Sequence, residues 1–122
     1  MSGTADANLI IAAINEQDAL HARAQAHLAR HAELLVPFSV GIELLFVARK
    51  HGRQYLELIE MANERFEVEG IGVLRTAAEA LDTGEVTTVF DAVHLADALH
   101  RHGALHTADQ VLHRSAFPTE PF

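Results

Sequence analysis

The stretch LLVPFSVGIELLFVARKHG, residues 34–52, decides the fold. The apolar residues 34–36 predict a short buried strand, which Pro37 ends. Ser39 is placed to cap a helix over residues 40–50, and Gly52 follows the end of that helix. A strand that leads directly into a helix is the repeating unit of α/β folds, so this stretch predicts one such unit.

The same alternation continues on both sides of this stretch. Further strands are predicted at residues 2–6, 66–68 and 104–106, with an edge strand at 115–117. Further helices are predicted at residues 7–16, 18–31, 53–63, 72–82 and 90–102, with Asp18 capping the second of these and a short turn beginning at Asp109. We therefore predict an α/β fold with a mostly parallel sheet, formed by one domain over residues 1–122.

Composition narrows the function classes. The 122 residues are 49% apolar and 21% charged, which supports a packed core. The chain has no cysteine, which excludes disulfides and thiol nucleophiles and agrees with a cytoplasmic location. No apolar run approaches the ~18–20 residues of a membrane span, and the first residues do not resemble a signal peptide. The net charge of −8 is unfavourable for binding a phosphate backbone unless acidic side chains hold divalent cations.

Glu43 lies in an apolar segment of the helix predicted at residues 40–50. Its neighbours one turn away include Val40, Phe46 and Val47. A carboxylate on an apolar helix face needs a strong partner or a shifted pKa. The ordinary alternative is a partly exposed glutamate at the edge of that face.

Asp6, Asp91 and Asp109 each lie just beyond a predicted strand or at the start of a predicted helix. Each one alone is explained by helix capping or by the helix dipole, although Asp91 is in line with His94 on the face that we expect to pack inward. Together they occupy positions that meet at the carboxyl ends of parallel strands. Crowded carboxylates repel one another, and Mg²⁺ or Mn²⁺ would relieve that repulsion while activating water toward a phosphodiester.

Four segments carry a resemblance to a known family: TADANLIIAAI (4–14), VPFSVGIELLFVARKHG (36–52), TTVFDAVHLADALHRHG (87–103) and ALHTADQVL (104–112). Their ordered motifs resemble those of PIN domains, especially the VapC-like toxins of toxin–antitoxin pairs. The resemblance implies a three-layer α/β/α sandwich around a parallel sheet of four to five strands. It also implies a ribonuclease that depends on Mg²⁺ or Mn²⁺, forms a homodimer and binds a cognate antitoxin.

The resemblance also assigns roles to individual residues. The catalytic and metal-binding residues would be Asp6, Glu43, Asp91 and Asp109. Asn8 and Thr107 would support them through hydrogen bonds. Among the few basic residues, Arg49, Lys50 and Arg53 are candidates for RNA binding, with surface solubility as the alternative. Asp97 should be a surface charge, since it lies about 240° around the helix from Asp91.

Two alternatives remain open from the sequence. One is a PIN-fold protein that no longer cleaves RNA and serves as a binding or assembly module. The other is a metal site built from histidines, for which His27 and His31 share one helix face. The sequence has no HExxH motif, Gly-x-Ser-x-Gly elbow or glycine-rich phosphate loop, so it gives no support to the corresponding enzyme classes.

Overall fold

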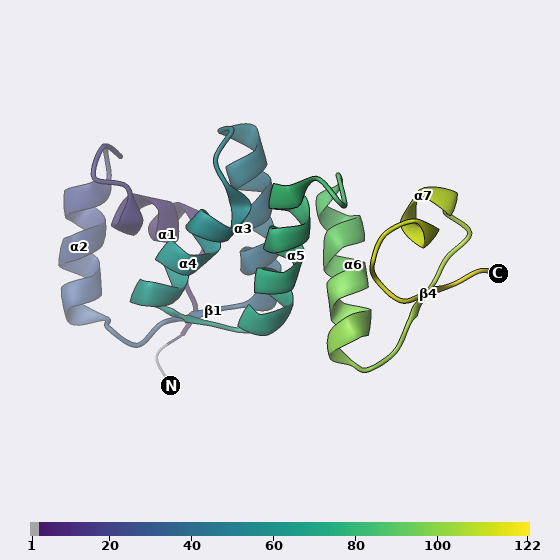
Figure 1. Cartoon of the computed structure of the whole chain (residues 1–122). Helices are drawn as coiled ribbons and strands as arrows, with labels where there is room; N and C mark the ends of the chain where they lie inside the picture. Colours follow the sequence, from purple (N-terminus) through teal and green to yellow (C-terminus); the bar gives the residue numbers. More distant parts are fainter. Residues whose placement is uncertain (1–2) are drawn as a thin grey trace.

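A computed structural model describes residues 3–122, and Figure 1 shows how their helices and strands are arranged. The helices within this range are α1 (Ala7–Ile14), α2 (His21–Arg30), α3 (Phe38–Lys50), α4 (Tyr55–Arg65), α5 (Ile71–Thr83), α6 (Val89–His100) and α7 (Gln110–His113). The strands are β1 (Leu35–Val36), β2 (Glu67–Val68), β3 (Leu105–His106) and β4 (Thr119–Glu120). None of these helices has the length and apolar character that a membrane span requires.

The strands form two separate parallel pairs. In the first pair, Leu35 lies opposite Glu67 and Val36 lies opposite Val68. Thr4 adds a single parallel bridge to Leu35. In the second pair, Leu105 lies opposite Thr119 and β3 and β4 run parallel. The α/β class is therefore confirmed, with short parallel strands between helices.

The predicted single sheet of four to five strands is wrong for residues 3–122. Each strand has only two residues, and the first predicted strand contributes only the bridge at Thr4, while Ser2 lies outside the described residues. The segment SGTAD offers almost no apolar surface to bury against helices, so little favours a longer strand there. Figure 1 shows α6 between α5 and the segment that carries β4, so the two strand pairs are not joined.

The predicted edge strand at residues 115–117 is also wrong, because β4 forms four residues later. Ser115 N donates to Leu112 O at 3.2 Å, and Phe117 N donates to Ser115 Oγ at 3.3 Å. These turn hydrogen bonds occupy the N–H groups that a strand would use in pairing. The chain then extends, and Thr107 N donates to Glu120 O at 2.9 Å.

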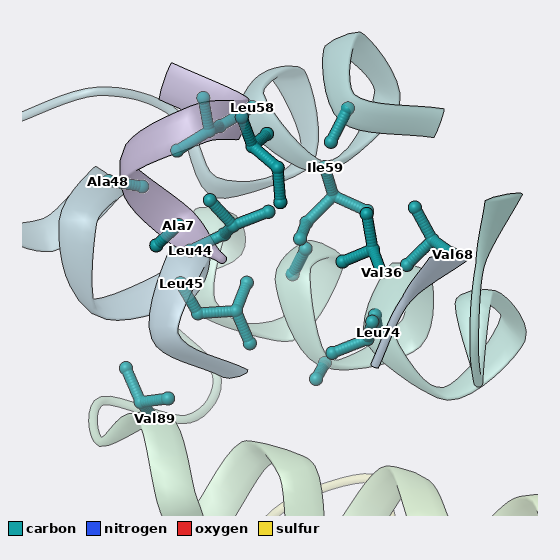
Figure 2. Packing of buried hydrophobic residues seen from close by; sticks show 14 of the residues in the cluster. Ala7, Val36, Leu44, Leu45, Ala48, Leu58, Ile59, Val68, Leu74 and Val89 are labelled. Carbon is teal, nitrogen blue, oxygen red and sulfur yellow. The ribbon is translucent and has the colours of Figure 1, made fainter. Parts of the chain in front are cut away.

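The core joins the inner faces of α1, α3, α4, α5 and α6. Its largest fully buried side chains are Ile10, Leu44, Leu45, Leu58, Ile59, Leu74, Leu95, Val36 and Val89. Figure 2 shows Leu44, Leu45, Ile59 and Leu74 converging on the space between the helices. Burying one such side chain stabilises the fold by roughly 1.5–3 kcal/mol, so the packing of helices dominates over the short strands.

Two helices begin at residues that are capped from elsewhere in the chain. α3 starts at Phe38, one residue before the predicted cap Ser39, and Phe38 N donates to Glu69 Oε1 at 3.1 Å. In α4, Asp82 accepts from both Tyr55 N and Leu56 N, at 2.7 and 3.0 Å. Asp18 was predicted to cap the helix over residues 18–31, but α2 begins at His21. Asp18 instead accepts from Leu20 N in the preceding turn.

Candidate active site

Asp6 and Asn8 lie at the start of α1. Asp6 is the N-cap, and its Oδ1 accepts from Leu9 N at 3.0 Å. The backbone before Asp6 is held by β1, because Ala5 N, of the preceding residue, donates to Leu35 O at 2.9 Å. Both side chains are exposed, and the second Asp6 oxygen has no hydrogen bond within residues 3–122. The capping role predicted as the ordinary alternative is therefore present, and it leaves one carboxylate oxygen available.

Glu43 projects from the middle of α3 into solvent. The face of α3 that packs inward consists of Gly41, Leu44, Leu45 and Ala48. The prediction that Glu43 occupies a buried apolar face is wrong, because Phe46, one turn later, is itself 40% exposed. In the described part of the chain, the Glu43 carboxylate accepts no hydrogen bond, so both of its oxygens are available.

Asp91 lies in the first turn of α6 and is half-buried. Thr88, the N-cap of that helix, donates from Oγ1 to Asp91 Oδ2 at 2.6 Å. His94, predicted to share an inward face with Asp91, is exposed, while Leu95 is fully buried. The inward face of α6 is thus rotated away from Asp91, and the carboxylate lies at the edge of the helix with a hydroxyl fixing one of its oxygens.

Asp109 is the N-cap of α7. Its Oδ1 accepts from Val111 N at 2.8 Å, and its own N–H donates to Thr107 Oγ1 at 3.1 Å. The Asp109 side chain is exposed. Thr107 therefore fixes the backbone at Asp109 through its hydroxyl, and the second carboxylate oxygen has no partner among residues 3–122.

The fold joins the two helices that carry two of these four carboxylates, Glu43 on α3 and Asp91 on α6. The rings of Phe46 and Phe90 lie 5.3 Å apart, and Arg49 Nη1 donates to Thr87 O at 2.7 Å, which ties α3 to the start of α6. Glu43 lies one turn before Phe46, and Asp91 directly follows Phe90. Figure 1 shows α1 and α7 on opposite sides of α3, α5 and α6, and no three acidic or histidine side chains of residues 3–122 come together as a metal site.

The four carboxylates are chemically suited to bind a hard divalent cation, but the structure does not bring them together around one point. Carboxylate oxygens are the ligands that Mg²⁺ and Mn²⁺ prefer, and each of the four side chains keeps at least one oxygen free of hydrogen bonds within residues 3–122. No three His, Asp or Glu side chains in that range lie close enough together to hold one ion. The alternative histidine metal site is also absent from residues 3–122. The rings of His27 and His31 stack 4.5 Å apart, but no third ligand lies near enough to complete a site.

The three basic residues predicted to bind RNA differ in their surroundings. Arg49 is exposed and bonded to the Thr87 carbonyl, and Lys50 is exposed. Arg53 forms an ion pair with Glu57 at 3.1 Å. Its charge is thus partly compensated, whereas the charges of Arg49 and Lys50 are not balanced by an ion pair within residues 3–122.

A basic surface on α2 was missed by the sequence reasoning. Arg23, His27 and Arg30 line a groove of about 400 Å³ together with Asn8 and other residues of α1 and α2. The ion pairs among residues 3–122 use other arginines, so these two keep their full charge. The signal was available in the sequence, because no acidic residue occurs between Asp18 and Glu33 in a chain of net charge −8.

Comparison with known proteins identifies the family. The family model of the PIN domain matches residues 4–118, which include all four carboxylates, Asn8 and Thr107. A search of curated proteins found no match to the chain. Because the match spans nearly the whole chain, the chain belongs to the PIN domain family, whose members are generally nucleases.

Proposed function

We propose that this protein is an endoribonuclease that depends on Mg²⁺ or Mn²⁺ and hydrolyses RNA phosphodiesters. The observation that carries the proposal is the family match over residues 4–118, which contains Asp6, Glu43, Asp91 and Asp109 in the order expected of the family motifs. PIN nucleases typically use divalent metal ions. The free carboxylate oxygens described above supply the hard ligands that such ions need.

Each residue has a defined task in this proposal. The four carboxylates would hold the cation once they are brought closer together than in the described arrangement, and the cation would supply Lewis-acid activation of water and of the phosphate. Thr88 holds one Asp91 oxygen at 2.6 Å and thereby orients the other. Thr107 fixes the backbone at Asp109. Asn8, the second residue of α1, offers an exposed amide two residues from Asp6.

RNA is the substrate that the basic surfaces favour. Arg23 and Arg30 on α2 lie near Asn8, and Arg49 and Lys50 end α3. Each phosphate contact made by such a residue releases counterions, so binding should weaken as salt rises. The measured slope of affinity against salt concentration should become shallower when Arg23 and Arg30 are replaced together by glutamine.

We further propose that the protein is the toxin of a VapBC-type pair in the cytoplasm, acts as a homodimer and is inhibited by a cognate antitoxin. The support is the resemblance of segment 87–103 to VapC-like toxins. Induction of the chain in a bacterial host should arrest growth, and the Asp91→Asn variant should not. Growth arrest by both the wild type and the Asp91→Asn variant would show that toxicity does not depend on the carboxylate site.

One observation favours a second candidate function, a PIN-fold binding or assembly module without catalysis. No three carboxylates gather around one point within residues 3–122. Under this alternative the protein binds RNA or protein but does not turn over substrate. Binding of Mn²⁺ without cleavage of any RNA in a mixed pool would support it.

The deciding experiment is cleavage of a mixed RNA pool with Mg²⁺, with Mn²⁺ and with EDTA. Wild type is compared with Asp6→Asn and Asp91→Asn. Asp97→Asn is the matched control, since Asp97 lies on the same helix as Asp91 and pairs at the surface with Arg101. Loss of a supporting partner of a metal ligand typically costs 10–100-fold in activity, so loss of a ligand should cost more than about 100-fold. Equal cleavage by wild type and Asp91→Asn would refute the proposed site.

A further inference from the structure

Two phenylalanine rings are exposed beside the proposed site. Phe46 on α3 is 40% exposed and Phe90 on α6 is 56% exposed. Their ring centroids lie 5.3 Å apart in an edge-to-face arrangement. The exposed His94 ring follows Phe90 at 6.1 Å. We call these three side chains the aromatic ledge.

The side chains of the aromatic ledge are not part of the buried core. α3 buries Leu44 and Leu45, and α6 buries Leu95 and Ala96, on faces other than those that carry the rings. Phenylalanine is among the residues most often buried, so two adjacent exposed rings are unusual for a stable fold. Exposed apolar groups that lie together mark binding sites more often than singly scattered ones.

The aromatic ledge is formed by the two helices that carry two of the proposed catalytic carboxylates. Glu43 precedes Phe46 by one helical turn on α3, and Asp91 follows Phe90 in the first turn of α6. Arg49 follows Phe46 by one turn and is held against the start of α6 by its bond to Thr87 O. A group that stacks on the ledge therefore lies against both of these helices, close to a guanidinium that can meet a phosphate.

We propose that the aromatic ledge stacks a nucleobase of the RNA strand next to the bond that is cut. This inference rests on the proposed ribonuclease function and adds a positioning element to it. Every nucleobase has an uncharged π face, so it can stack beside Glu43 and Asp91 without electrostatic repulsion. The adjoining phosphate can reach Arg49.

A second copy of the chain suits this surface less well. A symmetric dimer places the same patch on both subunits, so pairing of two ledges would bring Glu43 and Asp91 of both copies into one interface. Like charges brought together in this way oppose association. Three side chains also provide far less than the roughly 800 Å² per partner that a stable interface buries.

The test is a titration of single-stranded RNA that contains 2-aminopurine, whose fluorescence changes when it stacks. Wild type is compared with Phe90→Ala, Phe90→Tyr and Phe46→Ala. The control is Leu99→Ala, which removes an apolar side chain of α6 that is also 40% exposed and lies nine residues from Phe90. We expect Phe90→Ala and Phe46→Ala to weaken binding by about five-fold or more, Phe90→Tyr to restore it, and Leu99→Ala to leave it unchanged.

A second arm uses RNA with one abasic nucleotide at successive positions. When the abasic nucleotide is at the position that meets the aromatic ledge, Phe90→Ala should bind this RNA as tightly as wild type does. The base that stacks on Phe90 is already missing from that RNA, so removing the ring costs nothing further. Equal affinity of wild type and Phe90→Ala, or no binding of RNA by wild type, would overturn the inference. So would a homodimer in sedimentation that dissociates on Phe90→Ala, since a second copy would then occupy the ledge. Stacking of the base without cleavage of any RNA would refute the proposed ribonuclease function but would leave the inferred stacking on the aromatic ledge intact.

Discussion

Replacing Asp82 by alanine should destabilise the protein, although this residue is exposed and lies outside the candidate active site. Its two carboxylate oxygens accept from Tyr55 N at 2.7 Å and from Leu56 N at 3.0 Å. The first N–H groups of a helix have no acceptor within that helix. The residue that precedes α4, Gln54, makes no side-chain capping bond, so among residues 3–122 Asp82 alone caps α4 with a side chain.

The size of the effect follows from two opposed contributions. Loss of a capping oxygen costs about 0.5–2 kcal/mol, and two bonded N–H groups place Asp82 near the upper value. Asp82 also lies in the last turn of α5, where a negative charge is unfavourable, so its removal returns about 0.5 kcal/mol. The expected net loss is about 1.5 kcal/mol for Asp82→Ala. Asp82→Asn keeps an acceptor oxygen and should lose about half as much.

Urea unfolding monitored by circular dichroism measures these differences. Glu79→Ala is the matched control, because it removes the same charge from an exposed position of α5 that makes no hydrogen bond within residues 3–122. Substitutions at such surface positions usually change stability by less than about 0.5 kcal/mol. A loss for Asp82→Ala no larger than that of Glu79→Ala would refute capping of α4 by α5.

Three further outcomes are expected. Gly41→Ala should lower the free energy of unfolding by about 1–3 kcal/mol, because its Cβ would clash with Cδ1 of the fully buried Leu74; an unchanged thermal midpoint would show that Leu74 yields without cost. Thr88→Val removes the hydroxyl that holds Asp91 and should lower kcat about 10–100-fold with little change in stability, which single-turnover cleavage measures; equal rates would show that this hydrogen bond is not used. Chelation with EDTA should abolish RNA cleavage and added Mn²⁺ should restore it, whereas cleavage that continues in EDTA would exclude a divalent ion.

Helix boundaries could be predicted from the sequence where a nearby residue determines them. The helix predicted at residues 72–82 is Ile71–Thr83 in the structure, and Gly84 follows in the left-handed conformation with φ +78°. That conformation is open to glycine and costly for other residues, so a glycine after an amphipathic run is a reliable stop. The helices predicted to begin at residues 7 and 90 begin at Ala7 and Val89.

Helix starts that depend on distant residues could not be predicted. Ser39 has the side chain of a cap, yet α3 is capped by Glu69, which bonds Phe38 N from 31 residues further along the chain. The capping of α4 by Asp82 spans 27 residues. Which carboxylate reaches which helix end is decided by how helices pack, and a local sequence pattern carries no information on that.

The candidate site was predictable as a set of residues and not as an arrangement. Family motifs select Asp6, Glu43, Asp91 and Asp109, and their catalytic role stays a prediction. The expectation that Glu43 is buried was wrong because apolar neighbours on a helix were read as core, whereas Phe46 belongs to the aromatic ledge. The proximity of α3, which carries Glu43, to the start of α6, which carries Asp91, depends on contacts such as Arg49 with Thr87, 38 residues apart.

The C-terminal segment has a consequence for how the protein loses function. Of residues 105–120, only Leu112 is buried, while Leu105 and Phe117 pack partly buried against the core. The segment is also held by its own strand pair and by the bond from Ala116 N to Glu85 Oε1 at 2.5 Å. A segment with so little buried surface forms a cooperative unit that opens at a fraction of the global unfolding free energy. We expect its amides, among them Leu105 and Thr107, to exchange hydrogen well before those of α3 and α5. Because Asp109 lies on this unit, mild denaturant should remove activity while the helical core is still folded.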